Sequence, residues 1–108
     1  MLFRSKIDGQ PQELPNLIMM SKPYTDIKTI DNYIIREFDE NIDPIELMWH
    51  RDLKNRKLTI LEGKGWHFQK DNELPVEMLK KDIIYINALE WHRVIKGNTI
   101  LKIKIEEY

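Results

Sequence analysis

The chain has 108 residues, which is the length of a single domain. Its charged residues make up 32% of the sequence and nearly cancel, so that the formal net charge is −1. The sequence therefore lacks the basic excess with which proteins bind nucleic acids. Cysteine is absent, which excludes disulfides, thiolate metal sites and cysteine nucleophiles, so any metal must be held by nitrogen and oxygen ligands.

Targeting and membrane-spanning segments are not expected. The N-terminal residues contain no apolar run long enough for a signal peptide, and no stretch approaches the roughly 20 apolar residues of a membrane-spanning helix. We therefore expect a cytoplasmic protein that interacts with neither membranes nor nucleic acids.

The N-terminal part of the chain is predicted to be an irregular lead-in. Its first 24 residues contain three of the five prolines, and residues 16–20 have the pattern of a short strand. Residues 25–38 fit either a helical turn capped by Thr25 or a strand, because their second half is rich in β-branched and aromatic side chains. Asp43 and Pro44 then predict a turn.

From Pro44 onward the pattern indicates short β-strands separated by polar turns. Residues 62–65 and 96–98 contain glycine and are predicted to be hairpin turns, so that the strand after each turn returns antiparallel to the one before it. Several short strands at regular spacing favour a β-sandwich or a small barrel. The predicted strands are residues 45–52, 56–62, 66–69, 88–95 and 99–107, and residues 77–87 are predicted to form a short strand, a turn and an apolar strand.

The sequence "LEGKGW", followed by "LPVEMLKKDIIYINALEWHRVIKGN", resembles the core motifs of the cupin superfamily. The glycine hairpin of cupins corresponds to residues 61–63. Their Leu-x-x-Gly-Asp motif corresponds to residues 79–82, with Lys81 in place of the glycine. Their apolar strand that ends in Ile-Pro and is followed by a histidine corresponds to residues 85–92, with Asn87 in place of the proline.

The resemblance implies an all-β fold, namely a cupin-like double-stranded β-helix that forms a small conical barrel or jelly roll with an irregular N-terminal segment. We expect one domain over residues 1–108. In it, residues 44–105 would form the barrel core, and residues 1–40 would form the lead-in and covering strands. One open end of the barrel would hold the functional site.

The resemblance also implies a metal site. Cupins have a His-x-His motif followed by a glutamate, and these three positions fall on His50, Asp52 and Arg56, while the last family histidine falls on His92. Residues i and i+2 of a strand project to the same face, so His50 and Asp52 would converge on one ion. Two imidazoles and one carboxylate form the facial triad of non-heme Fe(II) proteins, which leaves three coordination positions open. We expect a divalent transition metal, with Fe or Mn favoured and Ni, Co or Zn also compatible.

Arg56 and Gln69 are candidates for substrate binding. A guanidinium is unable to ligate a cation, so Arg56, if directed inward, would bind a substrate carboxylate or pair with Asp52. It equally fits a solvent-facing position, and a metal-free barrel that binds an anion through Arg56 and the histidines is a further alternative. If a hairpin turn is centred on residues 63–65, Leu58 lies opposite Gln69, which would place Gln69 beside the site.

Trp49 and Trp91 each precede a histidine directly. Neighbouring residues of a strand face opposite ways, so these tryptophans would face outward if the histidines face the barrel interior. Large aromatic rings on the outside need cover, which we expect from a homodimer interface or from the first 40 residues. His67 is expected to lie further from the site, near the glycine turn.

These expectations favour a metal-dependent enzyme of dioxygenase, lyase or isomerase type that acts on a small molecule. The alternative is a non-catalytic barrel that binds or senses a small ligand, with or without a metal. The chain has no glycine-rich phosphate loop, and its serines are confined to Ser5 and Ser21 in the lead-in, which argues against a nucleotide hydrolase and a serine hydrolase.

Overall fold

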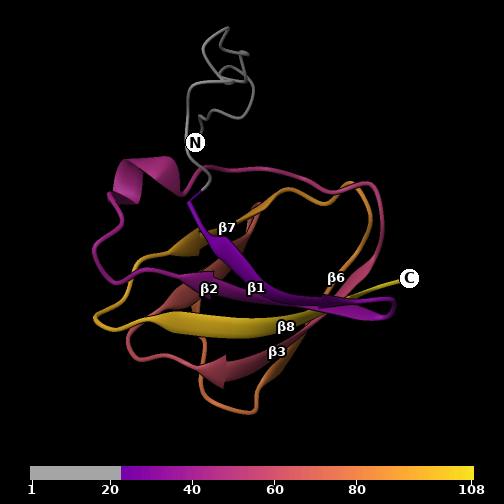
Figure 1. The fold of residues 1–108 in the computed structure, drawn as a ribbon. Helices are drawn as coiled ribbons and strands as arrows, with labels where there is room; N and C mark the ends of the chain where they lie inside the picture. The colour runs from indigo at the N-terminus through magenta and orange to yellow at the C-terminus, as the bar shows by residue number, and fades with distance from the viewer. Residues whose placement is uncertain (1–22) are drawn as a thin grey trace, which may run out of the picture.

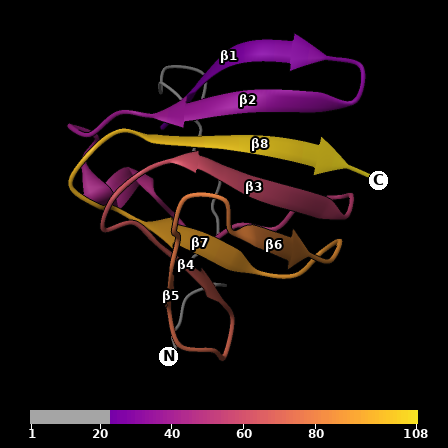
Figure 2. The same cartoon turned by 90° about the horizontal axis from the view of Figure 1, so that it is seen from below.

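A computed structural model describes residues 23–108, which form two antiparallel β-sheets (Figure 1). The larger sheet has the strand order β1-β2-β8-β3-β6, and the smaller sheet has the order β5-β4-β7. Figure 2 shows β1, β2, β8 and β3 side by side in that order, with the strands of the smaller sheet beyond β3. The elements in chain order are β1 (Thr25–Ile30), β2 (Tyr33–Phe38), the 3-10 turn η2 (Pro44–Glu46), β3 (Arg56–Glu62), β4 (His67–Lys70), β5 (Val76–Glu77), β6 (Ile83–Ile86), β7 (His92–Ile95) and β8 (Leu101–Glu107).

The core lies between the two sheets and follows from the alternation of side chains along the strands. In β8, Leu101, Ile103 and Ile105 are buried, while the residues between them are only partly covered. β3 buries Leu58 and Ile60 in the same way. The other buried apolar side chains of the described chain are Phe38, Trp66, Phe68, Met78 and Ile86.

The two glycine turns do not close hairpins, contrary to the sequence prediction. β3 pairs with β6 and β8, whereas β4 pairs with β5 and β7, so residues 63–66 cross from one sheet to the other. Residues 96–98 make a second crossing, from β7 to β8. Trp66 is fully buried in the core and donates a hydrogen bond from Nε1 to the carbonyl of Thr99 (2.7 Å). Because this large ring is buried between the sheets, the residues that follow β3 do not pair with it and enter the smaller sheet instead.

The prediction of a strand over residues 45–52 is wrong, because these residues belong to η2 and to an irregular segment that follows it. Asp43 accepts a hydrogen bond from the backbone two residues on (3.1 Å), and Pro44 occupies the first turn, so the chain begins a short 3-10 turn. Within that range His50 alone joins a ladder, through an isolated antiparallel bridge to His92.

Most of the other predicted strands are present. β3 and β8 form where predicted, and β7 occupies the second half of the strand predicted over residues 88–95. The ambiguous residues 25–38 form an antiparallel hairpin of β1 and β2 rather than a helical turn. The strand predicted at residues 16–20 lies outside the described residues. In residues 23–108 there is no helix with the length and apolar character needed to cross a membrane.

Gly97 lies where the two crossing connections meet, since the neighbouring Asn98 N–H donates to the carbonyl of Lys64 (2.9 Å). A Cβ on Gly97 would overlap the backbone of Lys64 and Trp66. We expect Gly97→Ala to lower the free energy of unfolding, measured by urea denaturation, by about 1–3 kcal/mol, the usual cost of overpacking. The exposed Lys64→Ala should change it by less than about 0.5 kcal/mol; equal effects of the two substitutions would contradict this account.

Candidate metal centre

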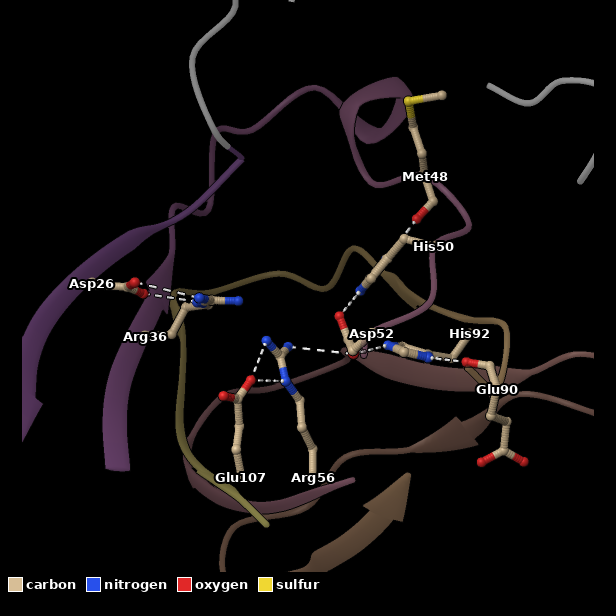
Figure 3. Close-up of polar contacts among 9 residues, drawn as sticks. All are labelled: Asp26, Arg36, Met48, His50, Asp52, Arg56, Glu90, His92 and Glu107. Carbon is tan, nitrogen blue, oxygen red and sulfur yellow. Dashed lines mark hydrogen bonds and ion pairs between the residues drawn. The ribbon is translucent and has the colours of Figure 1, made fainter. Parts of the chain in front are cut away.

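A cavity of about 300 Å³ lies between the two sheets, and most of its wall is apolar. The arginine, aspartate and histidine side chains in its lining are those of Arg36, His50, Asp52, Arg56 and His92 (Figure 3). The His92 side chain is 3% exposed and that of Asp52 is 14% exposed, whereas that of His50 is 49% exposed. These three polar side chains therefore extend from the buried His92 to the open side of the cavity at His50.

The two histidines are brought together by their backbones. His50 N–H donates to the carbonyl of His92 (3.0 Å), and His92 N–H donates to the carbonyl of His50 (2.9 Å). Residues that are directly opposite in such an antiparallel pair project to the same face. The centres of the two imidazole rings are consequently 4.3 Å apart.

Asp52 follows the bridge and is fixed by the turn before β7, because the Leu89 N–H donates to the carbonyl of Asp52 (2.7 Å). Its Oδ2 lies 3.2 Å from Nε2 of His92, and its Oδ1 lies 4.0 Å from Nε2 of His50. One ligand atom from each of these three residues lies within 4.8 Å of the others. The three residues predicted as ligands are thus adjacent in the structure, and the group could hold a metal ion.

Both rings direct Nε2 toward this group because Nδ1 is occupied elsewhere (Figure 3). His50 Nδ1 lies 3.1 Å from the carbonyl of Met48, and His92 Nδ1 lies 2.7 Å from the carbonyl of Glu90. A carbonyl oxygen accepts hydrogen bonds only, so Nδ1 carries the proton in each ring. The Nε2 lone pair of the neutral ring is then free, which is the arrangement that orients histidine ligands of metals.

The resulting arrangement of acceptors fits a cation. Asp52 Oδ2 is buried and accepts no well-aligned hydrogen bond from residues 23–108. A neutral His92 would place a second acceptor, Nε2, 3.2 Å from that oxygen. Two acceptors this close repel each other unless a proton or a metal ion lies between them. The donor set of two imidazoles and one carboxylate suits first-row transition metals such as Fe, Mn, Co, Ni and Zn.

The electrostatics of the site favour the metal-binding forms of two of the three candidate ligands, His50 and Asp52. Burial first and the nearby His92 second lower the pKa of His50 to about 4, even though half of the side chain is exposed. Burial acts to raise the pKa of Asp52, but a hydrogen bond from His92, donated when the ring also carries a proton on Nε2, and the Arg56 guanidinium outweigh it and hold that pKa below its usual range. His50 is therefore neutral and Asp52 is ionised at pH 7.

Arg56 faces the site, which the sequence left open. Its Nη1 lies 3.4 Å from Asp52 Oδ2, while its Nε and Nη2 each lie 2.8 Å from Oε2 of Glu107. The contact with Glu107 is the shorter one and involves two guanidinium nitrogens. This carboxylate therefore holds the Arg56 guanidinium at the edge of the His50, Asp52 and His92 group.

Gln69 does not line the cavity, and the pairing on which its placement rested is wrong. Leu58 lies opposite Ile84 and Ile105, whereas Gln69 lies opposite Arg93 in the other sheet. Since Phe68 faces the cavity, its neighbour Gln69 faces the opposite side of the sheet. Its side chain accepts a hydrogen bond from Arg93 Nε (2.9 Å) and donates one to the carbonyl of Glu73 (2.9 Å).

The outer face of the same backbone bridge carries the two tryptophans. The Arg93 guanidinium lies 4.9 Å from the Trp49 ring centre, and the Arg51 guanidinium lies 5.1 Å from that of Trp91. Each tryptophan is half-buried and is capped by the arginine of the opposite strand segment, a favourable cation–π arrangement. The homodimer interface on this face stays a prediction.

Two charged residues of the site were not identified from the sequence. Arg36 belongs to a segment whose pattern was ambiguous, and its inward position follows only from its place two residues before the buried Phe38 on β2. Glu107 is the last residue of β8 and lies opposite Arg56 in the β3–β8 ladder. The period-two alternation of β8 could have assigned the face of Glu107, but its partner depends on the register.

No family model and no curated protein sequence matches this chain, whereas several solved structures do. A cupin-2 domain protein from Shewanella frigidimarina matches with a TM-score of 0.54 and 13% identity over 79% of each chain. A cupin domain from Bordetella pertussis matches with a TM-score of 0.54 and 14% identity, over 82% of this chain and 98% of that one. The chain thus has the cupin-like double-stranded β-helix fold that its sequence motifs predicted.

The enzyme HppE also matches this chain. Its Fe(II) form has a TM-score of 0.53 and 16% identity over 94% of this chain and 62% of HppE, and a Co(II) form in complex with substrate matches as well. This chain therefore spans less than two thirds of the length of HppE, and likeness at this identity establishes the fold alone.

The protonation of His50 is testable by ¹⁵N NMR of metal-free protein. We expect a neutral ring at pH 7 with the proton on Nδ1, because the carbonyl of Met48 accepts only from a donor. The ring should remain neutral until the pH falls to about 4. A proton on Nε2, or a titration near the value of about 6.5 for free imidazole, would contradict the assigned geometry.

Proposed function

We propose that this protein is a metal-dependent enzyme that acts on a small molecule, with His50, Asp52 and His92 as the metal ligands. The observation that carries the proposal is the convergence of their ligand atoms within 4.8 Å at the wall of an apolar cavity. Three protein ligands leave coordination positions for substrate, water or dioxygen. Iron or manganese suits this donor set best, and nickel, cobalt or zinc is compatible with it.

The chemistry of such a site divides between the ion and the chain. A bound divalent ion would supply Lewis-acid activation of a substrate oxygen or a binding position for dioxygen. The chain's own residues orient the substrate: the apolar walls exclude water, and Arg56, held by Glu107 at 2.8 Å, offers a cation at the edge of the triad. We therefore retain Arg56 as a substrate-binding residue and remove Gln69 from that role.

The reaction class proposed is that of a dioxygenase, a lyase or an isomerase. The matches to HppE with Fe(II) and to HppE with Co(II) and substrate support a transition metal in a barrel of this shape. One fold supports many activities, so the support concerns the kind of site and not the substrate.

The position of Arg56 supports a second function, that of a non-catalytic barrel that binds or senses a small ligand without a metal. Arg56 Nη1 lies 3.4 Å from Asp52 Oδ2, and this contact partly neutralises the carboxylate that an ion would need. In that case a proton shared with His92, rather than a metal, would separate the acceptors of the site. Metal content distinguishes the two functions.

We expect protein purified without chelators to contain about one transition metal ion per chain, measured by elemental analysis. His92→Ala and Asp52→Asn should each lower metal content at least tenfold, because each removes one of three ligands. The matched control is His67→Ala, which deletes a histidine that lies across the sheet from Ile95, outside the cavity lining, and should keep the metal. A wild-type chain that takes up none of Fe(II), Mn(II), Ni(II) or Zn(II) would favour the metal-free function.

Open coordination positions are testable in the Co(II)-loaded protein. An enzyme site should bind azide, and its visible absorption spectrum should change saturably with azide concentration because a solvent position is replaced. His67→Ala protein should give the same titration as wild type. A spectrum that azide leaves unchanged would indicate a filled coordination sphere and thus a structural or sensing role.

A further inference from the structure

Arg36 lies in the wall of the cavity, on β2, a strand that supplies none of the three candidate metal ligands. It lies opposite Ile103 in the β2–β8 ladder and two residues before Phe38, and all three line the cavity. Its side chain is only 11% exposed. A guanidinium in a largely apolar wall costs free energy unless it is paired, so its contacts indicate what it does.

One edge of this guanidinium is held by the chain itself. Asp26, directly opposite on β1, accepts from Nε (2.8 Å) and from Nη2 (3.3 Å). The Tyr24 ring lies face-on, 3.6 Å from the guanidinium carbon. These two contacts fix the plane and the direction of the group.

The other edge of the guanidinium remains available. An arginine carries five N–H groups in a rigid fork, and Asp26 uses the side formed by Nε and Nη2. Nη1 makes no hydrogen bond to any residue in the range 23–108, so the end formed by Nη1 and Nη2 can receive a bidentate acceptor. Figure 3 shows this end pointing away from Asp26 toward Arg56 and Asp52.

The two arginines that line the cavity, together with the carboxylates paired with them, favour an anion once a metal is bound. Arg36 and Arg56 contribute two positive charges, which face three carboxylates, those of Asp26, Asp52 and Glu107. A divalent ion turns this single net negative charge into a single net positive charge. A ligand with one negative charge would then neutralise the cavity.

We infer that the cavity binds a small monocarboxylate with an apolar body, and that the free end of Arg36 is its anchor. This inference rests on the proposed function only in saying which end of the ligand reacts. That end would extend toward His50, Asp52 and His92. The carboxylate accepts two parallel N–H groups, a geometry that the planar fork of arginine matches. The apolar body lies against Phe38, Leu58 and Ile103, and a volume of about 300 Å³ admits only a small molecule.

The test is calorimetric titration of the full chain with hexanoate and with hexanamide, its uncharged analogue of the same shape. Zn(II)-loaded and metal-free protein are both titrated, and metal content is measured for each sample. We expect hexanoate to bind at least about tenfold more tightly than hexanamide, because its contacts with Arg36 are charge-assisted. Arg36→Gln should remove this preference, leave hexanamide binding unchanged and leave metal content unchanged.

Two further variants keep the test decisive. Arg93→Gln removes an arginine from the outer face and should bind hexanoate like wild type. If Arg36→Gln fails to fold, Arg36→Lys keeps the charge but loses the fork, and should weaken hexanoate binding severalfold. Equal binding of the two probes by wild-type protein, or a preference that survives substitution of Arg36, overturns the inference.

The outcomes also separate this inference from the proposed function. Hexanoate binding that disappears with the metal and is insensitive to Arg36→Gln would mean that the ion itself holds the carboxylate, and would overturn the role of Arg36. A chain that never takes up metal but shows the preference and its loss in Arg36→Gln would refute the metal-dependent function and support the anchor.

Discussion

The antiparallel bridge between His50 and His92 is the contact on which the site depends. Its two backbone hydrogen bonds attach the irregular residues 47–55 to the edge of the smaller sheet. Directly opposite residues share a face, so both imidazoles project into the cavity, and their flanking residues share the outer face. The same register therefore pairs the histidines inside and builds the tryptophan–arginine contacts outside.

The departures of this chain from the cupin motif are connected through charge. Arg56 stands where the family has a glutamate ligand, which exchanges a negative charge for a positive one next to the ion position. Glu107, opposite Arg56 on β8, supplies a carboxylate at 2.8 Å. The negative charge is thus kept within the site, but it pairs with the guanidinium, and three candidate metal ligands remain.

The parts of the fold that depend on local pattern were predictable from the sequence. β8 was recognised because its apolar and charged residues alternate with period two, and its side chains alternate between buried and partly exposed positions. β3 was recognised as a short segment rich in β-branched and apolar residues before a glycine-bearing turn. The three candidate ligands were brought together by motif spacing, although the expected reason was incomplete. His50 and Asp52 lie on an irregular segment, and the backbone bridge to His92 positions the first of them. The motif spacing thus identified adjacent residues even though the strand predicted over residues 45–52 is absent.

The parts that depend on distant contacts were not predictable. Gln69 was misplaced because a glycine turn indicates a reversal of the chain but not whether the next strand stays in the same sheet; here Trp66 enters the core and the chain crosses. Arg36 was missed because its burial requires Asp26, and their register includes an irregularity between Asp26 and Lys28 that the sequence does not show.

The three candidate ligands lie on two kinds of backbone, which has a kinetic consequence. His92 begins a strand of the sheet, while His50 and Asp52 lie on residues 47–55, which form no strand and are attached to the rest of the chain by hydrogen bonds at His50, Asp52 and Asn55. Such a segment opens locally far more often than the whole chain unfolds. Opening of this segment would therefore remove two of the three candidate ligands at once, so conditions that leave global stability unchanged could still alter how quickly a bound ion exchanges.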